Sequence, residues 1–123
     1  MKEYTADIEK ETLRNKNYRK VIFTANKMQL VLMSLKPKED IPMEVHPHID
    51  QFIRIESGQA EVTVNGRKHK LKDNGVIIVP LGSKHRVVNT SPSKTLKLYT
   101  IYAKPEHPKG RVQKTRADAL RAE

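Results

Sequence analysis

The chain of 123 residues contains no cysteine, which excludes a disulfide framework and any metal site built from thiolates. It also lacks long apolar runs: stretches such as Leu30–Met33 and Val76–Pro80 are far shorter than the roughly 20 residues that a bilayer span requires. The first 20 residues are charged throughout and contain no apolar segment typical of a signal peptide. We therefore expect a soluble cytoplasmic protein that does not associate with membranes.

Acidic residues are scarce relative to basic ones, because 14 Asp and Glu stand against 24 Lys and Arg, for a formal net charge of +10. Such a charge raises nucleic acid as a partner. The basic residues are nevertheless spread along the chain, and the densest group, at Arg67, Lys68, Lys70 and Lys72, contains no aromatic side chain to stack on a base. We expect a solvated basic surface that is compatible with an anionic small-molecule ligand and that makes nucleic acid a poorly supported partner.

Short segments of alternating apolar and polar residues, bounded by Gly, Pro, Asn and Asp, dominate the middle of the chain. Asn65-Gly66 lies between two of them and is typical of a type I′ hairpin turn, because both positions must tolerate a positive φ. Nine strands are predicted: Lys20–Thr24, Met28–Lys36, Met43–His46, Gln51–Ser57, Gln59–Asn65, Arg67–Lys72, Val76–Val79, His85–Asn89 and Thr95–Ala103. Nine short strands without intervening helices predict an all-β antiparallel sandwich or barrel.

The length of the chain suits one domain, at residues 1–123. Within it we expect a peripheral arm at 1–19 with an extra strand or a turn of helix, a barrel at 20–103 and a tail at 104–123. The tail should contain a short helix, because Thr115 and Asp118 have the spacing of a capping box. Branched apolar residues should line the interior: Ile53, Ile55, Val62, Val64, Ile78, Leu96 and Leu98.

Histidines are the residues of this sequence best suited to carry chemistry. His46 and His48 lie at alternate positions after Glu44, so an extended segment would direct all three side chains to the same side. Gln51 begins the next predicted strand, and His85 begins a later one. Imidazole and carboxylate groups bind borderline divalent metals, and an amide oxygen can complete the set. Spacing alone leaves two equal alternatives, a metal site and ordinary surface histidines.

Two longer motifs occur in order along the chain. The pattern G-x5-H-x-H-x(3 or 4)-E-x6-G falls on Lys38, Glu44, His46, Gln51 and Gly58. The pattern G-x5-P-x-G-x2-H-x3-N falls, with every spacing kept, on Asn74, Pro80, Gly82, His85 and Asn89. With these motifs the chain resembles the small single-domain cupins, and its last strand and tail resemble the branch labelled mannose-6-phosphate isomerase-like. The resemblance implies a double-stranded β-helix barrel, or jelly-roll sandwich, with a metal in its mouth, and it implies a homodimer.

The residues at the motif positions depart from the family pattern in four places. Glu44 replaces the first metal-binding histidine and Gln51 replaces the glutamate. Lys38 and Asn74 replace glycines. The resemblance therefore implies one divalent transition metal, of the kinds Fe, Mn, Ni, Zn or Co, with four ligands: Glu44, His46, Gln51 and His85. Their combined charge equals that of three histidines and one glutamate.

His48 is the alternative ligand or a substrate-binding residue, since a bulge could make His46 and His48 the paired histidines of the motif. His69 follows a lysine in a basic strand and is expected to be a structural or surface residue. No chemistry is assigned to His107. Asp50 should point away from Gln51 and remain a solvated carboxylate.

Two classes of function follow from these residues. In the first, the metal is a Lewis acid for isomerase- or dioxygenase-type chemistry on a sugar-like or carboxylic substrate, with Glu44 and then His48 as the nearest bases and no catalytic residue identified. In the second, the barrel is a non-catalytic module that binds or senses a small, anionic or sugar-like molecule. Acid–base enzymes tend to contain titratable groups whose different environments separate their pKa values. The sequence shows no second pair of this kind, which slightly favours metal-dependent binding. Nucleic-acid binding is a distant third alternative.

Overall fold

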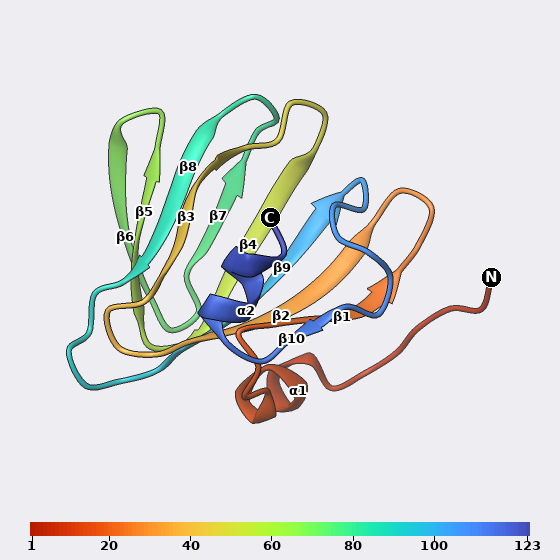
Figure 1. Ribbon diagram of the computed structural model, residues 1–123, viewed down its shortest axis with the longest axis horizontal. Coiled ribbons are helices and arrows are strands. Elements are labelled where there is room, and N and C mark those ends of the chain that lie inside the picture. Colours follow the sequence, from red (N-terminus) through yellow and green to blue (C-terminus); the bar gives the residue numbers. More distant parts are fainter.

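Two antiparallel β-sheets face each other in the computed structural model, which describes residues 1–123 (Figure 1). The strands are β1 (Arg19–Thr24), β2 (Gln29–Leu35), β3 (Asp40–Val45), β4 (Asp50–Ser57), β5 (Gln59–Val64), β6 (Arg67–Lys72), β7 (Val76–Val79), β8 (Lys84–Asn89), β9 (Leu96–Ala103) and β10 (Val112–Gln113). Six form one sheet in the order β10-β1-β2-β9-β4-β7, and four form the other in the order β3-β8-β5-β6. The predicted jelly-roll sandwich is confirmed.

All nine predicted strands are present, and the largest difference is at the start of β3, which begins at Asp40 instead of Met43. Pro42 lies where the pairing of β3 with β8 shifts register, between Ile41 and Glu44. A proline cannot donate a ladder hydrogen bond, so its presence in the sequence argues against a strand at this position. The strand nevertheless continues past Pro42 through a bulge. The sequence did not predict β10, which is two residues long and pairs with the first residues of β1.

The core lies between the sheets and contains 17 buried apolar residues. Ile53 and Ile55 of β4, Val62 of β5 and Leu98 of β9 are all at most 1% exposed, as predicted. The prediction for Ile78 is wrong, because its side chain is 64% exposed. Ile78 pairs with Phe52 rather than with Ile53, and this register places it on the outer side of an edge strand.

Two short helices flank the sheets. The N-terminal arm contains α1 (Ile8–Arg14), which begins where the Asp7 side chain accepts a hydrogen bond from the backbone N–H of Lys10. In the tail, α2 (Arg116–Arg121) begins with the predicted capping box, in which Thr115 accepts from the N–H of Asp118. Neither helix is long and apolar enough to cross a membrane.

Lys38 and Asn74, which stand at glycine positions of the two motifs, both have a left-handed backbone, with φ of 68° and 72°. Both positions therefore have a conformation that glycine adopts without strain. Asn tolerates this conformation, whereas Lys in it is strained by about 1–2 kcal/mol.

Replacing Lys38 by glycine should therefore raise the free energy of unfolding by about 0.5–1 kcal/mol, the strain relieved less the greater entropy of glycine in the unfolded chain. The substitution removes one exposed hydrogen bond, which Lys38 Nζ donates to the carbonyl oxygen of Thr90 at 3.2 Å. Urea denaturation measures the change. Asn74→Gly is the matched control and should gain less. A less stable Lys38→Gly would show that the Lys38 backbone is not strained.

Candidate metal centre

The predicted ligands lie on neighbouring segments at one end of the sandwich. Glu44 of β3 pairs with His85 of β8 across the ladder, and His46 directly follows β3. Gln51 is the second residue of β4, after the turn that connects the two strands. One ligand atom each from Glu44, His46 and His85 lies within 4.8 Å of the other two. The structure therefore brings together residues that are up to 41 positions apart in the sequence.

These side chains are withdrawn from solvent. His46, Gln51 and His85 are 6%, 3% and 2% exposed, and Glu44 is half-buried. Burial of polar groups is unfavourable unless each finds a partner. The hydrogen-bond partners of each buried polar atom therefore show which atoms remain free to bind a ligand.

Each imidazole has a partner at Nδ1. The carbonyl oxygen of Ser83 lies 3.1 Å from Nδ1 of His85, and Oε2 of Glu106 lies 3.0 Å from Nδ1 of His46. Oxygen acceptors at Nδ1 favour the tautomer that carries its proton there and leave the Nε2 lone pair free. Both Nε2 atoms lie next to Oε1 of Glu44, at 3.2 Å for His46 and 3.5 Å for His85.

Three buried atoms at this site have no hydrogen-bond partner: Nε2 of His46, Nε2 of His85 and Oε1 of Gln51. Gln51 is oriented by its amide nitrogen, which donates to Oγ1 of Thr100 at 3.0 Å and so leaves the oxygen free. Unpartnered buried polar atoms are rare in proteins and call for an explanation. Two nitrogen lone pairs and an amide oxygen beside a carboxylate are a donor set that fits a divalent transition metal.

The charges at this site favour an ionised carboxylate. Burial alone would raise the pKa of Glu44, but the adjacent imidazoles of His46 and His85 outweigh it and lower the pKa to about 2. For His46, burial lowers the pKa, and the carboxylates of Glu44 and Glu106 outweigh burial and raise it. Both carboxylates therefore stabilise positive charge at His46.

The sequence did not single out the segment after β9 as part of this site. Glu106 contacts His46, and the ring of His107 lies against Tyr102, whose hydroxyl is 3.3 Å from Nε2 of His107. Tyr102 is 1% exposed and meets the His46 ring edge-on. Burial, and then the positive charge of Arg19, lower the pKa of His107 to about 4, so its ring is neutral at pH 7.

A buried glutamine fixes this segment. Oε1 of Gln29 accepts from the backbone N–H groups of Glu106 and His107, at 3.1 and 2.9 Å, and its Nε2 donates to the carbonyl oxygen of His107 at 2.7 Å. Gln29 is fully buried, although it begins a mostly apolar strand. A polar residue at this position of β2 is the one signal in the sequence that the strand binds the backbone of another segment.

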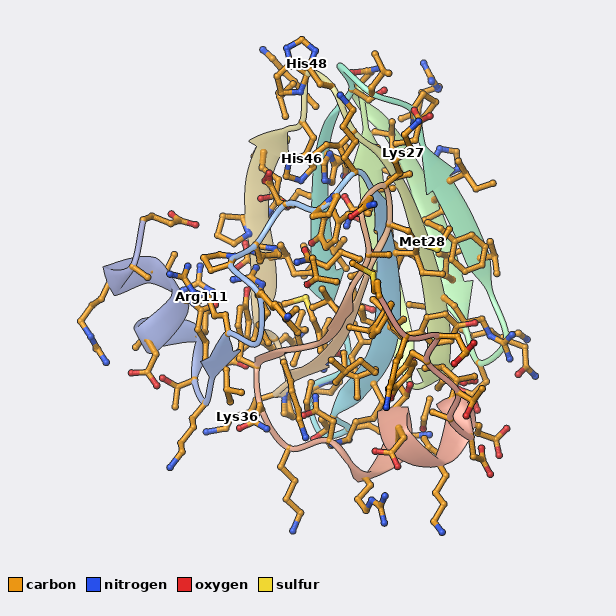
Figure 2. The ribbon with its side chains drawn as sticks, turned by 90° about the vertical axis from the view of Figure 1, so that its right-hand side faces the viewer. Lys27, Met28, Lys36, His46, His48 and Arg111 are labelled. Atoms are coloured by element: carbon orange, nitrogen blue, oxygen red, sulfur yellow. The ribbon has the colours of Figure 1, made fainter.

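The other candidate residues lie outside the cluster. His48 is exposed in the turn between β3 and β4, so the expected alignment with Glu44 and His46 does not occur: the extended strand ends at Val45. Figure 2 shows His46 inside the barrel and His48 at its outer tip. The Asp50 carboxylate is exposed and accepts a hydrogen bond from the N–H of Leu81.

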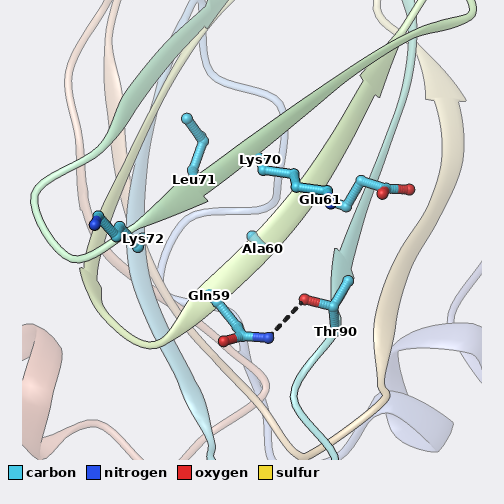
Figure 3. A pocket seen from close by; sticks show the side chains of 7 residues that line it. All are labelled: Gln59, Ala60, Glu61, Lys70, Leu71, Lys72 and Thr90. Atoms are coloured by element: carbon cyan, nitrogen blue, oxygen red, sulfur yellow. Dashed lines mark hydrogen bonds between the residues drawn. The ribbon is translucent and has the colours of Figure 1, made fainter.

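The hollow drawn in Figure 3 lies away from this cluster. A hollow of about 600 Å³ lies on the β5–β6 hairpin, where Glu61 faces Lys70 and the amide of Gln59 donates to Oγ1 of Thr90 (Figure 3). Its acidic and basic side chains come from facing strands of one hairpin, and no metal-ligating cluster lies among them. The cluster around Glu44 is instead compact and mostly buried.

Comparison with known proteins gives consistent matches. Residues 31–102 match the family model of the cupin domain. The chain is 48% identical over 113 residues to the uncharacterized protein L612 of Acanthamoeba polyphaga mimivirus, covering 89% of this chain and 70% of that protein. The crystal structure of BH2720 from Bacillus halodurans has 40% identity and a TM-score of 0.94, covering 98% of this chain and 95% of that one.

A more distant match bears on the mannose-6-phosphate isomerase-like branch of the family. A 68-residue segment is 31% identical to part of the mannose-1-phosphate guanylyltransferase ManC of Salmonella typhimurium, covering 55% of this chain and 14% of that protein. This match is consistent with the predicted mannose-6-phosphate isomerase-like branch. The two spaced motifs, the facing sheets and the matched family model all agree, and the chain belongs to the cupin family.

Proposed function

We propose that this cupin binds one divalent transition-metal ion, Fe, Mn, Ni, Zn or Co, and on it a small anionic or sugar-like molecule. In this proposal the ligands are Glu44, His46, Gln51 and His85. The observation that carries the proposal is that the buried Nε2 atoms of His46 and His85 make no hydrogen bond and converge on the ionised carboxylate of Glu44. Oε1 of Gln51 is likewise buried without a partner. These atoms are costly to bury unless an ion is bound to them.

The residues of the chain prepare the site for such an ion. Ser83 and Glu106 hold the two imidazoles with Nε2 free, and Thr100 holds Gln51 with its oxygen free. A bound divalent ion supplies a Lewis acid for a substrate oxygen. Four protein ligands leave one or two positions of a five- or six-coordinate ion for a small molecule.

A buried arginine near the centre favours an anionic ligand. The two carboxylates at the centre, Glu44 and Glu106, balance the charge of a divalent ion. Arg19 adds a further positive charge: it is only 7% exposed, and its Nη1 donates to the neutral Oε1 of Gln113 at 2.7 Å. No carboxylate lies within ion-pair distance of Arg19. The positive charge of Arg19 reaches His107, beside the centre.

A non-catalytic binding or sensing module is favoured over an enzyme by the state of Glu44. A general base works best with a pKa near the working pH. The pKa of Glu44 is about 2, because the neighbouring imidazoles outweigh burial. Glu44 is therefore a weak base, and His48 is exposed outside the cluster. Isomerase- or dioxygenase-type chemistry is the second candidate, carried by the open coordination positions.

A thermal-shift screen tests the proposed function. Metal alone should raise the melting temperature, and one class among sugars and small carboxylic acids should raise it by several degrees more only when metal is present. Turnover of that compound, lost in His85→Ala, would identify an enzyme, and stabilisation without turnover identifies a binding module. Stabilisation by the compound that persists after chelation would contradict recognition at the metal.

A further inference from the structure

A second hollow, of about 300 Å³, lies at the other end of the sandwich from His46. Figure 2 shows Lys36, which lines it, far from the labelled histidines. Four of its nine lining residues are lysines, Lys16, Lys36, Lys97 and Lys114, and most of the others carry hydroxyl groups. The lysines come from four separate segments: the loop before β1, the residue after β2, the start of β9 and the residue after β10. The fold, rather than one basic stretch of sequence, gathers them.

The positive charges in this hollow are not paired. None of the four lysines has a carboxylate oxygen within 4.0 Å. The single acidic residue in the lining is Glu39, whose Oε1 already accepts a hydrogen bond from the backbone N–H of Lys36 at 2.8 Å. A concave surface lined by charge of one sign concentrates counter-ions.

Lys97 gives the hollow a fixed ammonium group. Its Nζ donates to the carbonyl oxygen of Asn15 at 2.5 Å and to Oγ of Ser34 at 3.0 Å. Both of these partner residues are buried. Burial, and then the charge of Lys16, lower the pKa of Lys97. An anion in the hollow would offset both effects, and Lys97 still has a third N–H to donate.

We propose that this hollow binds the phosphoryl group of a small phosphorylated molecule. Ammonium groups bind phosphate as point charges, and the neighbouring hydroxyl groups offer further hydrogen bonds. The volume lies at the lower end of the range for small-molecule sites, which suits a phosphate ester or a diphosphate. The site is independent of the metal centre, since the two share no residue.

The lining favours a small phosphate over a nucleic acid. Its only aromatic residue is Tyr18, which is 2% exposed and whose hydroxyl donates to the carbonyl oxygen of Asp40 at 2.8 Å. Nucleic acids bound as single strands stack their bases on exposed aromatic rings, and this hollow offers none.

Calorimetric titration of the full-length, EDTA-treated protein with inorganic phosphate and with pyrophosphate tests the proposal. We expect one saturable site that binds pyrophosphate more tightly, with NMR amide shifts at Ser34 and Lys97 and none at His85. The double variant Lys36→Gln/Lys114→Gln should weaken binding at least tenfold. Lys70→Gln/Lys72→Gln, which removes the same charge from the hollow of Figure 3, should change it less than twofold.

Lys97→Met tests the fixed ammonium separately and should also weaken binding at least tenfold, with circular dichroism as the check of folding. The proposal is overturned if no saturable binding occurs, or if both double variants lose affinity equally, which would indicate general electrostatic attraction. It is also overturned if oligo-dT binds the hollow more tightly than pyrophosphate, or if binding requires added metal, which would place the anion at the metal centre.

Discussion

Replacing His85 by alanine should abolish binding of divalent metal, and replacing His46 should do the same. Each change removes one of only two nitrogen ligands and leaves a buried space beside the ionised carboxylate of Glu44. We expect the affinity to fall by roughly two to three orders of magnitude or more, because Glu44 and the neutral amide of Gln51 bind borderline metals weakly on their own. Elemental analysis of untagged protein, loaded with each metal and then desalted, measures the loss.

Two histidine variants serve as matched controls for this result. His69→Ala changes an exposed residue of β6 and should leave the metal content unchanged. His48→Ala changes the exposed turn and should at most weaken binding. Wild-type protein that holds less than about a tenth of an equivalent in every metal-supplemented preparation would show that this cupin has lost the metal.

Replacing Glu106 by glutamine should lower the metal affinity by about 10- to 100-fold while the ligands themselves stay in place. Glu106 lies 3.0 Å from Nδ1 of His46, where its charge fixes the tautomer and makes Nε2 a stronger donor. Glutamine keeps the size and an acceptor oxygen but removes the charge. Competition with a chromophoric chelator measures the affinity.

Glu61→Gln is the control for that variant, because Glu61 is a half-buried carboxylate on β5 that faces Lys70, away from the centre. Its metal affinity should equal that of the wild type. If Glu106→Gln binds metal as tightly as the wild type does, the contact between Glu106 and His46 has no part in tuning the ligand.

Local patterns were sufficient to predict most of the fold. Alternation and turn residues located nine strands, and the spacing of Thr115 and Asp118 located α2, because these features depend on neighbouring residues. Ile78 shows the limit of this approach. Alternation assigns the residues of a strand to two faces, but it does not say which face is buried. That depends on the strand pairing, which places Ile78 opposite Phe52 on the exposed side. The two-residue strand β10 is too short to produce any period.

The candidate ligands could be predicted for a different reason. The motif spacing selected Glu44, His46 and His85, which the structure places together, and the exposed position of His48 depends on a turn whose geometry the spacing does not encode. Glu106 carries no such signal, because it lies 60 residues beyond His46 and reaches it only through the contacts of Gln29. Residues that position a ligand are specified by tertiary packing rather than by sequence distance.

The 17-residue apolar core includes none of the candidate ligands. Burial of that core can therefore drive folding without an ion, in contrast to small zinc domains, which are unfolded until the metal binds. Loading of the proposed ion would then follow folding, and a chelator should empty the site while the barrel remains intact. The fraction of molecules that carry the ion would, in consequence, follow the free concentration of that ion.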